Sequence, residues 1–371
     1  MQVDYIVVGQ GVSGSFLSWY LWKAGKKVLV IDQSQAFTAS KVASGVINPV
    51  TGRRIVSTWM IDELMPFALD AYTTLGAQLG VPLIEQKNIL DFHATPQMML
   101  AFNEKFATDK QYLNRIDDLA YYEQYFNFFF GIGEINPCYL VDLSSLIEHW
   151  RKALLANNSL LEAKLVFADA AQDLQHDASQ PAAATFTLQD EQPFVTYKAQ
   201  TYTASAIFFC DGTSGFDSPY FKMLPYARNK GEAIIAEIPD LPRNNIYKQG
   251  ITLVPWKNNQ WWIGSTYDWQ FPDLLPTQAF RNKVELHLQQ WLKLPYSIVD
   301  HIATDRPANL ERRPFAGYHP LHPNVGILNG MGTKGCSLAP YFAHQIVQEI
   351  IDGTPILPAA DVQRFRKVLS R

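Results

Sequence analysis

A glycine-rich turn near the start of the chain constrains the fold most. The apolar run of residues 5–8 predicts a strand, Gly9-Gln10-Gly11-Val12-Ser13-Gly14 follows it, and residues 16–23 are compatible with a helix. A second apolar run, residues 28–31, ends at Asp32, roughly 20 residues after the turn, where an acid normally binds a ribose hydroxyl. This order predicts a βαβ unit that binds a dinucleotide. Because Asp32 would repel a 2′-phosphate, NADP is disfavoured.

A second turn near the end of the chain repeats the glycine spacing. Residues 326–329 predict a strand, Gly330-Met331-Gly332-Thr333-Lys334-Gly335 follows, and residues 337–352 predict a helix. One interpretation is a turn that packs a helix closely on a strand. The other is a second helix N-terminus directed at the same cofactor, suited to negative charge on a reduced flavin. A cofactor held by both ends of the chain favours FAD over NAD.

Length and composition predict two domains. A chain of 371 residues exceeds the roughly 250 at which a single core stops growing, and 47% hydrophobic against 18% charged residues argues against disorder. No long linker is evident, so we expect interleaved domains. The predicted fold is α/β (α+β overall), with a Rossmann-like FAD-binding domain (1–85, 140–215 and 315–371) and a substrate domain on a mainly antiparallel sheet (86–139 and 216–314). Residues 169–184 resemble a surface hairpin or meander.

Charge and cysteine usage exclude several classes of function. The formal charge of -4 lacks the basic excess of a dedicated nucleic-acid binder. Cys138, Cys210 and Cys336 are widely spaced, which suggests neither a disulfide framework nor a zinc site. The histidines show no metal-ligand spacing, so we expect no metal. Without a signal peptide or an apolar span of membrane length, we expect a soluble, cytoplasmic protein; the oligomeric state is left open.

Several segments in a specific order carry a family resemblance. They are the first glycine turn with Asp32; residues 43–49; Val141-Asp142 before a helix; residues 206–212; and Arg306-Pro307 through Gly317 to the second glycine turn. In these segments the chain resembles the FAD-dependent oxidoreductase family of D-amino-acid oxidase, glycine oxidase and sarcosine oxidase. Residues 264–268 and 332–335 and the tail around Arg364 look most similar to the oxidase half of the bifunctional enzyme that trims carboxymethylaminomethyl-uridine in tRNA.

The resemblance implies non-covalent FAD and a set of residues that would hold it. Pyrophosphate would contact the first glycine turn, the adenosine ribose Asp32, the adenine the backbone of Ala171, and the isoalloxazine edge the second turn. Cys336 follows that turn, and we expect it to be a packed thiol rather than a covalent flavin link. The full predicted set is Gly9, Gly11, Val12, Ser13, Gly14, Asp32, Gln33, Ala43, Ser44, Gly45, Ala171, Asp211, Gly212, Gly330, Gly332, Thr333, Lys334 and Gly335.

The resemblance also implies a substrate site and a reaction. Arg306 stands where relatives hold a substrate carboxylate; the alternative is a structural arginine between domains. Tyr267 would place a phenol near the substrate; the alternative is an ordinary core or surface tyrosine. Lys334 would stabilise reduced flavin; the alternative is a solvated lysine at a helix start. Thr252 and Trp262 depart from the family pattern, which leaves the substrate and the electron acceptor open.

The predicted function is FAD-dependent oxidation of a C–N bond in a small amino acid or secondary amine by hydride transfer to flavin N5, followed by imine hydrolysis. One alternative is a tRNA-modifying oxidase that removes a carboxymethyl group from a modified wobble uridine; the negative charge disfavours tRNA as a partner. Another is a flavin-binding redox protein without amine turnover. An NAD-dependent dehydrogenase is the most distant alternative.

Overall fold

The apolar runs around the first glycine turn form the centre of a parallel sheet. In the computed structural model, which describes residues 1–52, 54–168 and 182–371, β1 (Tyr5–Val8) pairs in parallel with β2 (Val28–Ile31) on one side and β16 (Ala206–Phe209) on the other. Helix α1 (Val12–Lys23) joins β1 to β2, as predicted. The six strands run in the order β11 (Leu160–Leu161), β2, β1, β16, β23 (Val325–Asn329) and β22 (Phe315–Tyr318); only β22 is antiparallel to its neighbour.

Alternate residues of these strands enter two different cores, which gives this half of the molecule three layers. Val7 and Val30 pack with helices α1, α3 (Ile61–Leu79), α6 (Leu143–Ala156) and α8 (Gly335–Asp352). Ile6 and Ile31 face the other way. That face is covered by a four-stranded sheet of β12 (Lys164–Phe167), β13 (Ala183–Gln189), β14 (Gln192–Tyr197) and β15 (Gln200–Thr203). The predicted meander at 169–184 lies mostly outside the described residues.

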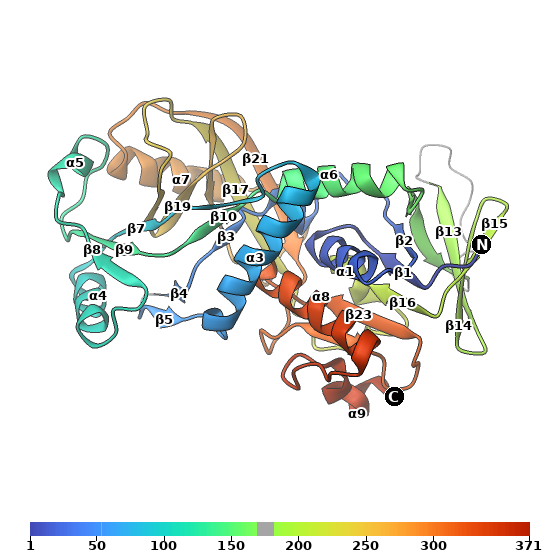
Figure 1. Cartoon of the computed structure of the whole chain (residues 1–371). Coiled ribbons are helices and arrows are strands. Elements are labelled where there is room, and N and C mark those ends of the chain that lie inside the picture. Colours follow the sequence, from blue (N-terminus) through green and yellow to red (C-terminus); the bar gives the residue numbers. More distant parts are fainter. Residues whose placement is uncertain (53, 169–181) are drawn as a thin grey trace.

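A larger, mainly antiparallel sheet forms the other lobe (Figure 1). Its order is β21 (Ser297–Arg306), β17 (Asn229–Glu237), β20 (Gln260–Gly264), β19 (Ile251–Pro255), β18 (Ile246–Gln249), β7 (Ile89–Phe92), β9 (Ile132–Ile135) and β8 (Leu113–Arg115). Only the β18–β7 pair is parallel. Helix α7 (Gln278–Trp291) shares a core with this sheet through Val284, Leu288 and Trp291.

Smaller elements connect the lobes or cover their edges. They are α2 (Ala39–Val42), α4 (Pro96–Thr108), α5 (Ala120–Glu123), α9 (Arg366–Leu369), the three-stranded sheet of β3 (Val46–Ile47), β10 (Tyr139–Val141) and β6 (Ile84–Gln86), and the pair of β4 (Val50–Thr51) with β5 (Val56–Ser57). The two large sheets draw their strands from alternating stretches of the chain. The domain boundaries stay a prediction, and two of them, at 85 and 139, fall within β6 and β10.

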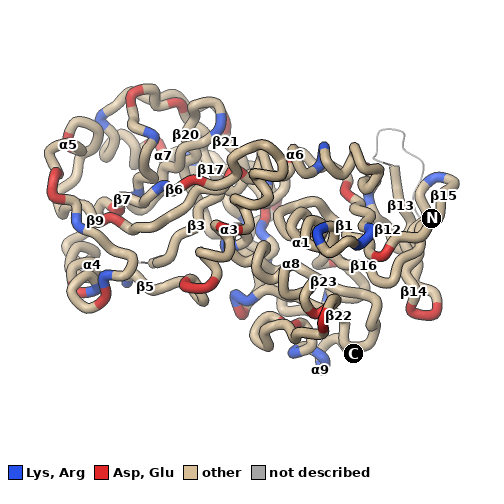
Figure 2. The backbone as a smooth tube through the Cα atoms, viewed as in Figure 1, with Lys and Arg blue, Asp and Glu red and all other residues tan. Residues whose placement is uncertain are grey.

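Local signals in the sequence place the helix ends as expected. Asp142 caps α6 by accepting a hydrogen bond from the Ser145 backbone N–H at 2.9 Å, and Gly353 ends α8 in the left-handed conformation. Acidic and basic residues are interspersed along the chain in both lobes (Figure 2). In the described part of the chain, no helix has the length and apolar character needed to cross a membrane.

Candidate functional site

Four segments predicted to bind the cofactor meet at one edge of the six-stranded sheet. Gly9 follows β1, Asp32 follows β2, Asp211 follows β16 and Gly330 follows β23. These strands are neighbours and parallel, so their carboxyl ends lie at the same edge. In open α/β sheets this edge is where ligands bind.

The first glycine turn is too crowded for side chains. Gly9 has a φ of +92°, and a Cβ there would lie 2.6 Å from the carbonyl oxygen of Cys210. A Cβ on Gly14 would overlap the carbonyl oxygen of Gly9. The start of α1 therefore packs directly on the end of β1, which brings the backbone N–H groups of Val12 and Ser13 to the sheet edge.

The segment after β2 folds over this helix start. The Val12 N–H donates to Ser40 Oγ at 3.1 Å, a contact that sequence reasoning missed because Ser40 lies outside any motif. Ala43 and Ser44 follow α2, and Gly45 has a φ of +82°. A Cβ on Gly45 would overlap the carbonyl oxygen of Val141. The segment from Ser40 to Gly45 thus runs from the first turn to β10.

Asp32 is fixed by a network that includes a residue not predicted from the sequence. Its carboxylate accepts hydrogen bonds from the Gln10 N–H at 2.9 Å, the Ser34 N–H at 2.8 Å and Arg151 Nη1 at 2.9 Å. Arg151, on α6, also donates to Glu162 at 2.7 Å. A carboxylate has about four lone-pair sites, so one remains for a ribose hydroxyl. The neighbouring Gln33 is half-buried.

The second glycine turn brings another helix start to the same place. A Cβ on Gly335 would lie 3.4 Å from Val12 Cγ1, so the first residues of α8 and α1 are in contact. The two helices lie side by side in Figure 1. Of the two interpretations of this turn, the contact favours a second helix N-terminus beside the first. Gly332 donates its N–H to the carbonyl oxygen of Pro307 at 3.0 Å, and Thr333 is exposed.

Asp211 and Gly212 are tied to the second turn through Asn329. The Asn329 side chain donates to the Gly212 carbonyl oxygen at 2.8 Å and to Asp211 Oδ1 at 3.3 Å. Burial raises the pKa of Asp211 to about 7, although the Asn329 hydrogen bond opposes the shift. The ends of β16 and β23 are therefore held together by side chains as well as by the strand pairing.

Lys334 and Cys336 lie in low-polarity surroundings. Lys334 Nζ is 3.5 Å from Thr58 Oγ1, and burial lowers its pKa to about 8. The amine is thus not the fully solvated lysine of the alternative interpretation. Burial raises the pKa of the Cys336 thiol to about 12, which keeps it protonated and argues against a reactive thiolate beside the turn.

Arg306 ends β21, and the oxygens that accept hydrogen bonds from its guanidinium are neutral. Nη1 donates to Asn229 Oδ1 and to the Thr266 carbonyl oxygen, and Nη2 donates to Ser265 Oγ at 2.9 Å. The ring of Tyr267 lies 5.6 Å from the guanidinium carbon. Burial lowers the pKa of Arg306. Among the described residues, no carboxylate forms an ion pair with it.

Glycine also makes room for this arginine. A Cβ on Gly231, in β17, would overlap the Arg306 guanidinium. An isolated glycine within a strand pattern signals a close approach, so the sequence held a sign of this contact. Pro307, the residue after Arg306, accepts a hydrogen bond from the Gly332 N–H. Arg306 is therefore close in space to the second glycine turn.

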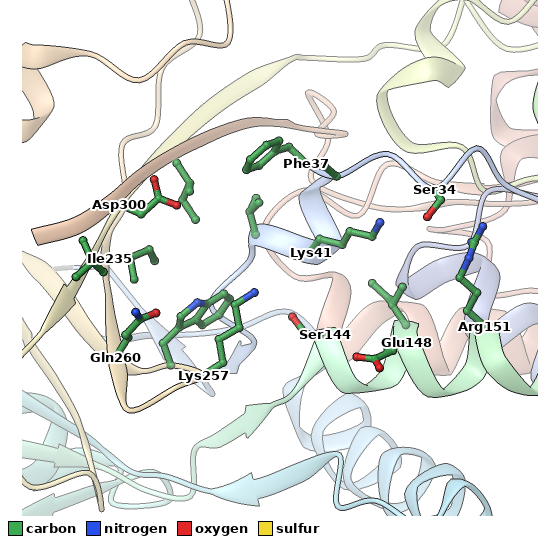
Figure 3. Close-up of a pocket in the computed structure, with 16 residues that line it drawn as sticks. Ser34, Phe37, Lys41, Ser144, Glu148, Arg151, Ile235, Lys257, Gln260 and Asp300 are labelled. Atoms are coloured by element: carbon green, nitrogen blue, oxygen red, sulfur yellow. The ribbon is translucent and has the colours of Figure 1, made fainter. Parts of the chain in front are cut away.

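A cavity of about 600 Å³ lies between the lobes (Figure 3). Arg151 and Glu148 reach it from α6, whereas Ile235 and Asp300 lie on the side of the antiparallel sheet. None of the predicted site residues lines it. It borders the Asp32 network through Arg151 and does not contain the glycine turns.

The described residues fit a bound FAD. Two glycine turns whose Cβ positions are blocked, two helix starts in contact and an acid with a free lone-pair site meet at the sheet edge. Ala171, predicted to contact the adenine, lies outside the described residues.

The comparisons with known proteins agree with this geometry. The family model described as FAD dependent oxidoreductase matches residues 4–349. Glycine oxidase from Bacillus cereus is 16% identical, with a TM-score of 0.76 and coverage of 100% of this chain and 99% of that chain. L-proline dehydrogenase from P. horikoshii is 14% identical, with a TM-score of 0.73 and coverage of 99% and 98%. Iminodiacetate oxidase from Chelativorans sp. is 15% identical, with a TM-score of 0.71 and coverage of 96% and 97%. At these identities, the structures show a shared fold.

The fold and the sheet-edge site define a dinucleotide-binding α/β enzyme. The chain belongs to the FAD-dependent oxidoreductase family of D-amino-acid oxidase. This confirms the predicted family, the fold class, the FAD cofactor and the assignment as an oxidoreductase.

Proposed function

We propose that this protein oxidises a C–N bond of a small carboxylated amine or amino acid and that Arg306 binds the substrate carboxylate. The observation that carries the proposal is the guanidinium of Arg306, whose hydrogen-bond partners are all neutral oxygens. A half-buried cation that forms no ion pair among the described residues is suited to an external anion. A planar guanidinium binds a carboxylate with two parallel hydrogen bonds, so the substrate carboxylate would displace some of these neutral acceptors.

The position of Arg306 supports this role. Pro307 accepts the hydrogen bond of Gly332, so an anchored carboxylate would lie close to the turn expected at the flavin edge. FAD, when bound, supplies the acceptor for a hydride from the substrate carbon. The chain's contribution is then to orient that carbon and to exclude water, and Tyr267 would cover one side of the anchor.

We also propose roles for the residues at the sheet edge. The backbone N–H groups of Gly11, Ser13 and Gly14 would hold the pyrophosphate, since those of Gln10 and Val12 donate to Asp32 and Ser40. The remaining lone pair of Asp32 would accept a ribose hydroxyl. Lys334, whose pKa is lowered to about 8, would be partly charged near neutral pH and would stabilise negative charge on a reduced ring.

An anaerobic panel of amines tests the proposal. The protein is mixed with primary and secondary amino acids in the absence of oxygen, and the absorbance of bound FAD is followed together with release of an oxo acid. We expect at least one carboxylated amine to bleach the flavin and yield its oxo acid. If no member of the panel does so, amine oxidation is wrong and a flavin-binding protein without turnover becomes the better account.

An aminoacetate group on a modified tRNA uridine is the second candidate substrate. It would present the same carboxylate to Arg306, and Tyr267 and Trp269 beside it are 46% and 48% exposed, which leaves aromatic faces available to stack on a base. A gel shift with tRNA carrying this modification, together with glyoxylate release, would distinguish it from a small free substrate.

A further inference from the structure

The start of β17 carries two sets of side chains with different contacts. Because side chains alternate along a strand, Asn229 and Gly231 face one side, and Lys230 and Glu232 face the other. Asn229 accepts a hydrogen bond from Arg306, and Gly231 leaves space for its guanidinium. Lys230 and Glu232 are 2% and 1% exposed, so two opposite charges are buried behind the proposed anchor.

These two residues hold both ends of the segment between β20 and α7, residues 265–277. At its start, Lys230 and Asp268 exchange backbone hydrogen bonds of 2.9 and 3.0 Å. At its end, Lys230 Nζ donates to the Leu275 carbonyl oxygen at 2.5 Å. Glu232 accepts from the Thr277 N–H at 2.6 Å and from Thr277 Oγ1 at 3.0 Å. The 265–277 segment is therefore held to β17 by backbone hydrogen bonds at its start and by the Lys230 and Glu232 side chains at its end.

The same segment shapes the surroundings of Arg306. Ser265 Oγ and the Thr266 carbonyl oxygen accept hydrogen bonds from the guanidinium, and Tyr267 lies against it. The Glu232 N–H donates to Thr266 Oγ1 at 2.9 Å, which connects the buried pair to the residues that orient Arg306. Loosening the segment would therefore change the direction in which the guanidinium points.

Directed hydrogen bonds explain why this buried position carries charges. Lys230 Nζ and Glu232 Oε1 are 3.7 Å apart, and His301 Nε2 lies 3.0 Å from Glu232 Oε2. Apolar side chains would fill such a position at least as stably. They would not bind the backbone groups of Leu275 and Thr277, so the polar pair is what holds this end of the segment.

We propose that Lys230 and Glu232 are positioning residues for substrate binding: they fasten the 265–277 segment so that Ser265 and Thr266 hold the Arg306 guanidinium toward the substrate carboxylate. This inference rests on the proposed function of Arg306. It assigns a role to two residues that neither touch the substrate nor belong to the glycine turns.

The test replaces both charges together, because removing one would leave the other buried and unpaired. The variant is Lys230→Met with Glu232→Gln. Its matched control is Lys105→Met with Asp109→Asn, which removes a partly exposed i,i+4 ion pair of 2.7 Å at the end of α4. The readouts are cleavage by chymotrypsin after Tyr267 and Trp269, mapped by mass spectrometry, and the KM and kcat for a carboxylated amine.

We expect the double variant to be cleaved about 10-fold faster at these two positions. Its KM should rise about 10-fold with kcat and FAD content little changed, since small misplacements of a binding group have effects of this size or larger. The control should match the wild type in every readout. Unchanged cleavage, or faster cleavage with an unchanged KM, would overturn the positioning role.

Arg306→Ala in the same assay separates the two proposals. If it leaves the KM unchanged, the function proposed for Arg306 fails; if it raises the KM and the double variant does not, only the positioning role fails. Should the double variant not fold, Thr277→Val removes a donor to Glu232, together with the side-chain cap of α7, and keeps the charge pair. It should shift cleavage and KM in the same direction by about 3-fold, and no shift would equally overturn the proposal.

Discussion

The edge of the parallel sheet and the surroundings of Arg306 are built in different ways. At the sheet edge, the crowded positions are glycines and most contacts are to backbone, as between Gly14 and Gly9. Around Arg306, side chains from β17, from β21 and from the segment after β20 come together, and Asn229 is directly opposite Arg306 in the strand register. The first glycine turn, residues 9–14, which we call the cradle, has no room for side chains at Gly9 and Gly14. The cluster around Arg306 can accept other side chains, but we expect such changes to weaken its selectivity for the substrate.

The comparison indicates that FAD binding and substrate selection depend on different parts of the molecule. The cradle depends on close packing of α1 on β1, which is also a packing contact of the core, so its loss should affect folding and FAD together. The Arg306 cluster lies at the end of an antiparallel sheet with a core of its own. Changes there should alter the substrate constants and leave FAD bound.

The largest effect is expected from Gly14→Val. Its side chain would collide with the backbone of Gly9, which cannot move without separating α1 from β1. We expect little folded protein and no bound FAD, measured by the visible spectrum and the yield of soluble protein. Gly25→Asn is the control, because Gly25 has a φ of +74° with nothing within 4 Å and asparagine tolerates that conformation. A Gly14→Val variant that is obtained at normal yield with bound FAD would contradict the claim that the turn has no room for a side chain at this position.

A large effect confined to the substrate is expected from Arg306→Ala. Loss of a bidentate, charge-assisted anchor should raise the KM for a carboxylated amine about 100-fold or more, with full FAD content. Arg281→Ala, on the outer helix α7, is the control and should leave the KM unchanged. A variant that lost FAD instead would show that the two regions are not separable.

An intermediate effect on the cofactor is expected from Asp32→Asn. The amide would keep the shape of the side chain but lose the charge-assisted bond to a ribose hydroxyl, so the Kd for FAD should rise about 10-fold or more. Fluorescence titration of the apoprotein measures it. Asp4→Asn, which changes a carboxylate bonded to the Lys27 N–H at 2.7 Å, provides a control on the same sheet. Equal affinities in the two variants would count against the ribose role.

The smallest effect is a pH dependence from Lys334. Its pKa is lowered to about 8 in the folded protein from an ordinary value of 10.5. Between these values the unfolded chain binds more protons, so this lysine makes stability rise with pH across the window, and below about pH 8 its burial costs stability. The free energy of unfolding, compared between the wild type and Lys334→Met, should therefore increase for the wild type relative to the variant from pH 8 to 10. A difference independent of pH would show that the amine is not perturbed.

The sequence predicted more of the sheet edge than of the surroundings of Arg306. Glycine spacing and the acid at Asp32 are local signals, and they placed the cradle correctly at the end of β1 and β2. Ser40 and Arg151 could not be predicted, because their contacts depend on how α2 and α6 fold back over the sheet edge. The cluster around Arg306 depends on strand register, which one sequence does not specify. Gly231, whose missing side chain leaves space for the Arg306 guanidinium, was a local signal of this contact.

The central claim is that one chain holds FAD at the sheet edge and selects its substrate through a carboxylate bound to Arg306. The most direct measurement is anaerobic flavin bleaching by two matched amines, N-methylglycine and dimethylamine, or the corresponding pair for whichever amino acid proves to be the substrate. The account predicts that the carboxylated member bleaches the wild-type flavin at a concentration about 100-fold lower and that Arg306→Ala removes this difference. Equal bleaching by both amines in the wild-type protein would contradict it.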